Sequence, residues 1–469
     1  MDAVACSAVN EACVAEDVQV NFTAKFLCEI DSAKRAFSRK VHESLSPLDE
    51  IPCAYHDLTT LHDDHKLTCG SHQQKACPLP EILDLLMGGI SCKDFARCNS
   101  NKAVMHGAKI FNSKSTPGKS ADTMHGFTRL LDMAYPEMCI VENVDELADE
   151  NLHREALDMF LAGLASRGYD CKVFILNLAE FGIPQMKKRM YLLALLRPGR
   201  KFKVMDGQAF FAKVQHLLEL FKLEGPSLAE VLLPESDRTV QEELLRLEER
   251  PTKRGTMSSA TLQQHCQAWT NLGQRFQMGG KQVRKSDAES PWFNALTMRE
   301  QAVLEYHQKL RGKSRDMADR SSEGLMKHAQ FAMLDVSQSI KYGSTATFNT
   351  RDCLVSQTIL PESRMYISLE AGEPLAEGRD IHRLITGEEA LMLNGFPTRH
   401  AALVENVRST SNHLLHNMGG NAFASVVVVA LLTATIFSLD RSAQVDDMMT
   451  SSREETEMAM ALIKKARAL

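Results

Sequence analysis

The sequence predicts an α/β protein with a doubly wound, mostly parallel sheet and a smaller inserted domain. Short apolar runs alternate with polar turns and helical stretches through roughly the first 200 residues. Several of these runs end in acids or glycines, as strands do where a parallel sheet presents its carboxyl ends. Hydrophobic residues make up 44% of the chain and charged residues 24%, which is normal for a globular protein.

The expected strands are KFLCEID (25–31), DLLMGGI (84–90), EMCIVENV (137–144), KVFILNL (172–178) and RMYLLALL (189–196). The stretch HGFTRLLDMAY (125–135) has helical spacing and separates two of them. Ligands of such sheets bind at the carboxyl ends of the strands, so polar residues at these ends are the first functional candidates.

Composition divides the chain into four parts. We expect the first part of the main domain over 1–200 and an insert over 201–380. A return to the main domain follows over 381–440, and a surface helical tail over 441–469. Within the insert, 206–250 indicates acidic helices, and 251–295 indicates a loop-rich module that contains both tryptophans. The tail carries a Ser452/Glu455 capping box, which favours a helix.

Charge and cysteine usage limit the partners and the compartment. The net charge of −6 gives no global basic field, but residues 251–330 hold 13 Lys and Arg against 7 Asp and Glu. Such an island suits a polyanion, or is a solvated charged surface. The 12 cysteines show no tight framework, and no secretory signal is visible at the N-terminus. We therefore expect reduced thiols and a nuclear or cytoplasmic protein that is not secreted.

The apolar stretch AFASVVVVALLTATIFSL (422–439) approaches the length of a membrane span. Serine and threonine residues interrupt it, and it directly follows a Gly-Gly-Asn turn. We expect a helix buried under the sheet, and no membrane partner.

Candidate functional residues follow the strands in order: Glu29, Asp57, Cys92 after Gly88-Gly89, and Glu142-Asn143-Val144. Gln185, Lys187 and Arg189 alternate along one strand and so share a face. Downstream, GGNAF (419–423) predicts a tight turn into a helix. Taken singly, each has an ordinary structural explanation, and a lone cysteine is most often a buried, inert thiol.

Taken in order, these motifs make the sequence resemble the cytosine carbon-5 methyltransferases that use S-adenosylmethionine. The resemblance rests on Glu29, Asp57, the nucleophile loop GGISCKDFA, the ENV triplet at 142–144 and FGIPQMKKRMYLLA. It continues in RLITGEEALMLNGFP and GGNAFASVVVVA, so it covers most of the chain.

The resemblance implies a reaction at carbon 5 of cytosine in double-stranded DNA, with the base flipped out of the helix. Cys92 would add to carbon 6, which makes carbon 5 reactive, while Glu142 neutralises charge at ring nitrogen 3. Arg189 would bond the base carbonyl oxygen, and Lys187 a phosphate or the same pocket. The implied catalytic residues are Cys92, Glu142, Asn143, Lys187 and Arg189, and the substrate-binding residues are Gln185, Lys187 and Arg189. The implied cofactor-binding residues are Glu29, Asp57, Asn421 and Phe423; no metal is expected, and the insert is the candidate target-recognition domain.

Three departures from the family pattern matter. Ser91 stands where proline usually stiffens the nucleophile loop, so we expect a freer loop, while Lys93 favours the Cys92 thiolate. Lys187 replaces an arginine and loses bidentate geometry. The Phe-x-Gly-x-Gly cofactor loop and its strand, central in the sheet, do not precede KFLCEID.

The third departure leaves two interpretations, an N-terminally incomplete version of a working enzyme, which we favour, and a remnant that binds the cofactor weakly. Three functions compete with a DNA methyltransferase. They are a tRNA cytosine methyltransferase, a catalytically dead nucleic-acid-binding protein, and a cysteine hydrolase, which lacks an obvious histidine partner for Cys92.

Overall fold

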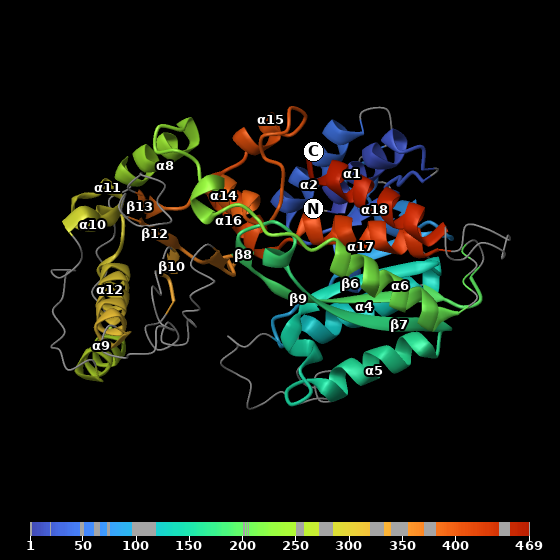
Figure 1. Ribbon diagram of the computed structural model, residues 1–469, viewed down its shortest axis with the longest axis horizontal. Coiled ribbons are helices and arrows are strands. Elements are labelled where there is room, and N and C mark those ends of the chain that lie inside the picture. The colour runs from blue at the N-terminus through green and yellow to red at the C-terminus, as the bar shows by residue number, and fades with distance from the viewer. Residues whose placement is uncertain are drawn as a thin grey trace.

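The computed structural model describes residues 2–18, 20–46, 51–60, 66–72, 76–95, 119–199, 202, 204, 206–249, 258–271, 285–318, 333–338, 355–369, 381–439 and 451–468. A central sheet with helices on both faces forms the main body, and the insert lies to one side of it (Figure 1).

The central sheet has four strands in the order β5 (Leu85–Gly89), β6 (Met138–Val144), β9 (Lys188–Leu196) and β7 (Tyr169–Asn177). β5 and β6 are parallel, whereas β9 runs antiparallel to both β6 and β7. Three of the four strands therefore point the same way, which confirms the predicted, mostly parallel sheet.

Alternation along the strands gives the sheet two buried faces. In β6, Met138 and Ile140 pack into one core while Cys139 and Val141 pack into the other. The first face is covered by α1 (Asp2–Ala15), α6 (Gly207–Leu220), α17 (Ser425–Ser438) and α18 (Ser451–Ala468), and the second by α4 (Lys119–Ala134) and α5 (Arg154–Ala165). The fold is therefore doubly wound, as predicted.

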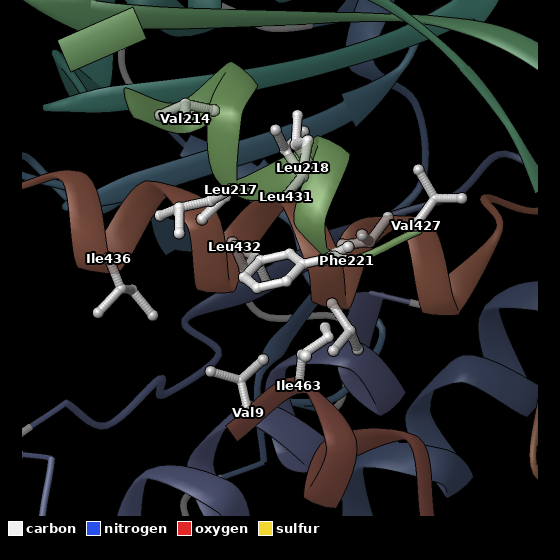
Figure 2. Packing of buried hydrophobic residues seen from close by; sticks show 14 of the residues in the cluster. Val9, Val214, Leu217, Leu218, Phe221, Val427, Leu431, Leu432, Ile436 and Ile463 are labelled. Atoms are coloured by element: carbon white, nitrogen blue, oxygen red, sulfur yellow. The ribbon is translucent and has the colours of Figure 1, made fainter. Parts of the chain in front are cut away.

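Helix α17 is the centre of the first core. Figure 2 shows Leu431 and Leu432 of α17 packed in one cluster with Leu217 and Phe221 of the α6 segment and Ile463 of α18. The expected buried helix at 422–439 is confirmed, since most of its side chains are shielded from solvent. No single helix in the described ranges is long and apolar enough to cross a membrane, although the bent pair α16 (Asn412–Asn421) and α17 meets that test by length and composition.

The tail prediction needs a correction. Helix α18 forms, but Ala459, Leu462 and Ile463 are buried against α1 and α17, so it belongs to the core rather than to the surface. The side chains of its first turn, including Ser452 and Glu455, lie outside the described residues.

A second, two-stranded parallel sheet pairs β1 (Phe26–Cys28) with β2 (Cys53–Tyr55), connected by α2 (Ser32–Leu45). Among the described residues this pair is a sheet of its own, without hydrogen bonds to the four-stranded sheet. The hairpin β3 (Lys66–Thr68) and β4 (Ala76–Pro78) lies between β2 and β5 in the chain.

The insert has its own hydrophobic core and a three-stranded antiparallel sheet, β10 (Met333–Asp335), β12 (Met365–Leu369) and β13 (Ile381–Leu384). Its helices are α7 (Leu228–Val231), α8 (Arg238–Glu249), α9 (Ser259–Asn271), α10 (Lys285–Glu289), α11 (Pro291–Asn294) and α12 (Met298–Ala318). The described part of the module predicted to be loop-rich is thus helical, because Trp269 and Trp292 are fully buried and organise it.

Packing also shifts the predicted domain boundaries. Helix α6 belongs to the main core although it follows residue 200, and β13 completes the sheet of the insert although it follows residue 380. The return to the main domain then consists of α14 (Gly387–Met392), α15 (Val404–Arg408), α16 and α17. Strand β8 (Gln185–Met186) of the main domain pairs with β11 (Ser356–Gln357) of the insert.

A candidate active site at the ends of the central strands

Glu142 lies near the end of β6, and Arg189 lies at the start of the neighbouring strand β9, so that the two side chains are in contact. The register pairs Val144 with Arg189, which places the guanidinium Nε 3.3 Å from Glu142 Oε1. The two side chains are only 13% and 14% exposed. Burial raises the pKa of the Glu142 carboxyl, because desolvation outweighs the attraction of Arg189 and Lys187 for the ionised form. The site therefore holds a carboxyl that binds a proton more readily than an exposed glutamate does.

The Cys92 loop leaves β5 beside this pair. Gly89, the last residue of β5, pairs with Glu142, and Cys92 follows three residues later. The Ser91 N–H donates to Thr123 Oγ1 of α4 at 3.1 Å, and Asp94 and Ser120 exchange two hydrogen bonds of 3.1 and 2.8 Å. The expectation that Ser91 frees the loop is corrected, because the N–H that proline lacks is bonded to α4.

Lys187 is buried behind the pair rather than exposed to a phosphate. Its Nζ donates to Asn394 Oδ1 at 2.8 Å and to the Ala422 carbonyl at 2.7 Å, and the residue is 2% exposed. Burial and the nearby Arg189 lower the pKa of Lys187 to about 7, against the attraction of Glu142 and Cys92. Of the two expected roles of Lys187, a phosphate contact does not fit this buried position, since its Nζ binds Asn394 and the return segment.

Replacing Lys187 by methionine should remove a pH dependence of stability. A lysine that titrates near its ordinary pKa of 10.5 when unfolded, and at about 7 when folded, stabilises the protein fully at high pH and loses that contribution as pH falls through about 7. The thermal unfolding temperature of the wild type relative to Lys187→Met should therefore rise between about pH 7 and pH 10. The exposed neighbour Lys188 supplies the control, Lys188→Met, and parallel profiles for wild type and Lys187→Met would contradict the prediction.

Gln185 and Asn143 are both buried and bind protein groups. Gln185 is fully buried, donates through Nε2 to the Leu393 carbonyl and accepts from the Ile359 N–H at 3.3 Å. Asn143 Nδ2 donates to the Ile90 carbonyl at 3.3 Å and so fastens the Cys92 loop to β6. The predicted shared face of Gln185, Lys187 and Arg189 is confirmed by the alternating burial along 185–189.

Asn394 is a site residue that the sequence analysis missed. Besides accepting from Lys187, its Nδ2 donates to the carbonyls of Ala422 at 3.1 Å and Phe423 at 2.9 Å. Asn394 is fully buried, and it connects Lys187 just before β9 to the segment that leads into α17. Its position in LMLNGFP, a stretch already matched to the family, was the available signal.

The structure brings the two predicted carboxylates of the cofactor site together. Glu29 and Asp57 follow the paired strands β1 and β2. Burial, and to a smaller extent the charges of Asp57 and Glu29, raise the pKa of the Cys28 thiol to about 12. Oε1 of Glu29 accepts from the Asp31 N–H, and Oδ1 of Asp57 accepts from Thr59, each at 2.8 Å. Within the described residues the second oxygen of each carboxylate accepts no hydrogen bond, so both remain available to hydroxyl or amine donors.

The two downstream cofactor candidates are placed differently from each other. Phe423 packs against the end of β5, where a Cβ on Gly89 would lie 2.9 Å from its ring. Asn421 is exposed and donates to Asn417 Oδ1 at 3.0 Å. The predicted tight turn at GGNAF is corrected, because Gly419 to Asn421 form the end of α16 and the chain turns at 422–424.

A thiol loop, a carboxyl and a largely buried guanidinium thus lie together at the strand ends of a doubly wound α/β sheet, the edge where such sheets bind their ligands. The chain belongs to the C-5 cytosine-specific DNA methylase family, whose model matches residues 59–437. This finding confirms the family resemblance and covers every central strand of the site.

Curated relatives of this chain are methyltransferases. The Type II methyltransferase M.SacI of Streptomyces achromogenes is 26% identical over 200 residues, 38% of this chain and 46% of that protein. The DNA (cytosine-5-)-methyltransferase DMT5 of Cryptococcus neoformans var. grubii is 21% identical over 456 residues, 94% of this chain and 16% of that protein. The chain spans less than half the length of either relative.

Two solved structures are also similar. The S. pombe Dnmt2 methyltransferase matches at 14% identity with a TM-score of 0.41, covering 92% of this chain and 95% of that one. A putative DNA modification methyltransferase encoded within an E. coli prophage matches at 13% identity with a TM-score of 0.44, covering 93% and 95%.

Proposed function

We propose that this protein transfers a methyl group from S-adenosylmethionine to carbon 5 of cytosine in DNA through a covalent Cys92 adduct. The observation that carries the proposal is the buried Glu142–Arg189 pair, 3.3 Å apart, beside the loop of Cys92. Carbon 5 of cytosine is a poor nucleophile, and its activation needs a thiol and a proton donor on opposite sides of the ring.

Cys92 and Glu142 would carry out the activation of the base. The Cys92 thiolate forms a bond to carbon 6, and the displaced electron pair moves into the ring as Glu142 shares its proton with nitrogen 3. When bound, the sulfonium cofactor would supply the methyl group to carbon 5 and would leave as the neutral thioether. Loss of the carbon-5 proton to a water molecule, return of the shared proton from nitrogen 3 to Glu142, and cleavage of the Sγ–C6 bond would restore the ring, the carboxyl and the thiolate.

Arg189 has two roles in this proposal. Its guanidinium bonds the carbonyl oxygen of the base, and its charge limits the cost of ionising Glu142 after the proton has moved. Lys187, Gln185, Asn143 and Asn394 act as positioning residues, because all four are buried and bind protein groups. They hold β6, β8 and the return segment around the reacting groups.

The residues present fit the adenosine end of the cofactor. Carboxylates with an available oxygen suit ribose hydroxyls and an exocyclic amine, which assigns Glu29 to the ribose and Asp57 to the base. Phe423 and Asn421 follow from the family motif, and Phe423 closes against the glycine end of β5. These carboxylates would orient the cofactor toward the Cys92 loop.

DNA is proposed as the substrate, because the curated relatives reported above are DNA and Type II methyltransferases and the insert has its own packed core beside the site. The target cytosine must be flipped out of the duplex to reach a buried carboxyl. We propose a nuclear or cytoplasmic location for this activity. A tRNA cytosine substrate is the alternative, and a nucleic-acid-binding protein without catalysis is the third outcome of the test.

Trapping with 5-fluorocytosine distinguishes these functions. Fluorine at carbon 5 cannot leave as a proton does, so the Cys92–C6 bond should persist and a slower-migrating protein–DNA species should appear on a denaturing gel. The reaction is run with S-adenosylmethionine and either double-stranded DNA or tRNA that carries the analogue. An adduct with tRNA alone would overturn the DNA assignment, and retained DNA binding without any adduct would overturn the enzyme assignment.

A further inference from the structure

Four side chains away from the Cys92 site converge on one point. They are Cys53 at the start of β2, Cys69 and His72 in the turn after β3, and Cys77 in β4. Their three sulfur atoms and one imidazole nitrogen all lie within 4.8 Å of one another. The sulfurs of Cys53, Cys69 and Cys77 are 3.5, 3.2 and 3.4 Å from the same nitrogen, Nδ1 of His72.

Hydrogen bonding does not account for this arrangement. A ring nitrogen carries either one proton or one lone pair, so it makes one such bond, not three at nearly equal distances. Around a tetrahedral zinc ion with Zn–S of about 2.3 Å and Zn–N of about 2.0–2.1 Å, the separation of sulfur from nitrogen is about 3.6 Å. The observed separations are close to that value for all three cysteines.

We propose that Cys53, Cys69, His72 and Cys77 bind a structural zinc ion. Three thiolates and an imidazole are soft and borderline ligands that select zinc over magnesium or calcium. Because four protein ligands complete a tetrahedron, no position is left open for water or substrate, and the role is structural.

The surrounding backbone holds these ligands in place. The Gly70 N–H donates to the Ala54 carbonyl at 2.7 Å, and an isolated antiparallel bridge pairs Tyr55 with Cys69 in the turn that leads to His72. The Ser71 hydroxyl donates to the Pro52 carbonyl at 2.8 Å, and the Tyr55 hydroxyl donates to the Pro78 carbonyl at 3.2 Å. The turn and β4 are therefore already attached to β2 on both sides of the ligand cluster.

The short elements explain why a metal is useful here. Strands β3 and β4 have three residues each, and a two-stranded hairpin of that length is marginal without another constraint. A zinc ion would join this hairpin to β2, whose first residue is Cys53. Asp57 follows β2 by two residues, so the ion would also fix the segment that presents this carboxylate.

Metal analysis of the full-length protein tests the site. Protein expressed with zinc, purified under reducing conditions and dialysed should retain about one zinc per chain, measured by inductively coupled plasma mass spectrometry. Cys69→Ser and Cys77→Ser should each lower the retained zinc at least tenfold. Cys266→Ser is the matched control, because Cys266 is an exposed thiol on α9 outside the cluster and its loss should leave the zinc content unchanged.

Cobalt substitution provides a measurement that does not depend on folding of the variants. The wild-type protein, stripped of metal and loaded with Co²⁺, should show thiolate-to-metal charge transfer and the visible bands of a tetrahedral site. A reduced, folded wild type that takes up neither zinc nor cobalt would overturn the proposal. A disulfide between two of the three cysteines under the same reducing conditions, found by mass spectrometry of peptides, would also overturn it.

Discussion

Replacing Cys92 by serine is expected to lower methyl transfer by at least about 10³-fold and to abolish the covalent adduct. A serine hydroxyl at this position stays protonated near neutral pH and is a far weaker nucleophile than a thiolate. The neighbouring Lys187 ammonium and the Ser91–Thr123 bond do not depend on the sulfur, so the loop should keep its position. Single-turnover transfer of a labelled methyl group to DNA measures the loss.

Two controls make the result specific to the chemistry. Cys266→Ser removes an exposed thiol of the insert and should leave the rate unchanged. DNA binding by Cys92→Ser, measured without turnover, should stay within about threefold of the wild type, because the backbone supports of the loop remain. A Cys92→Ser protein that keeps more than a tenth of the transfer rate would show that another group attacks the base.

Breaking the buried Arg383–Glu389 pair should destabilise the junction between insert and main domain by about 3–5 kcal/mol. Both side chains are fully buried, and Arg383 donates to Glu389 through two nitrogens at 2.6 and 2.9 Å. Arg383 also donates to the Leu233 carbonyl at 2.7 Å, and Glu389 accepts from the Leu233 N–H at 2.9 Å. Arg383→Met leaves the Glu389 carboxylate buried without its cation. The unpaired, desolvated charge accounts for most of the expected loss in the free energy of unfolding.

Tryptophan fluorescence measures this loss selectively. The chain has two tryptophans, Trp269 and Trp292, and both are buried in the insert, so their emission follows unfolding of that part. Denaturant should shift their transition to a lower concentration in Arg383→Met, while the exposed-pair variant Arg154→Met of α5 serves as control. The double variant Arg383→Met/Glu389→Met should recover part of the loss, and a single variant as stable as the wild type would contradict the prediction.

The strands of the central sheet were predictable because their signal is local. Long runs of apolar residues at 137–144, 172–178 and 189–196 form β6, β7 and β9 within a few residues of the expected limits. The antiparallel direction of β9 was not visible in the sequence, because pairing direction depends on which strand lies beside which. The glycines and polar residues at the strand ends likewise marked the site without showing which atoms meet.

The partners of the buried charges could not be read from the sequence. Lys187 donates to Asn394, which lies 207 residues away, and neither residue carries a local pattern that selects the other. The family resemblance implied that Lys187 contacts a phosphate or lies in the base pocket, and its burial among protein acceptors could not be read from that motif. The tail helix was assigned to the surface for a similar reason, since the apolar face formed by Ala459, Leu462 and Ile463 needs α1 and α17 to be buried.

By itself, the sequence predicted where most strands of the main domain lie along the chain, and it singled out Cys92, Glu142 and Arg189 as the candidate reacting groups. These features depend on residue type, periodicity and motif order, all of which are written along the chain. Only the tertiary structure decided that Ser91 anchors the loop, that Lys187 is internal and that Cys53 joins Cys69, His72 and Cys77. Those contacts join segments that lie far apart in the sequence. They form only because the whole sheet and its helices pack together, and no local sequence pattern records which segments that packing brings into contact.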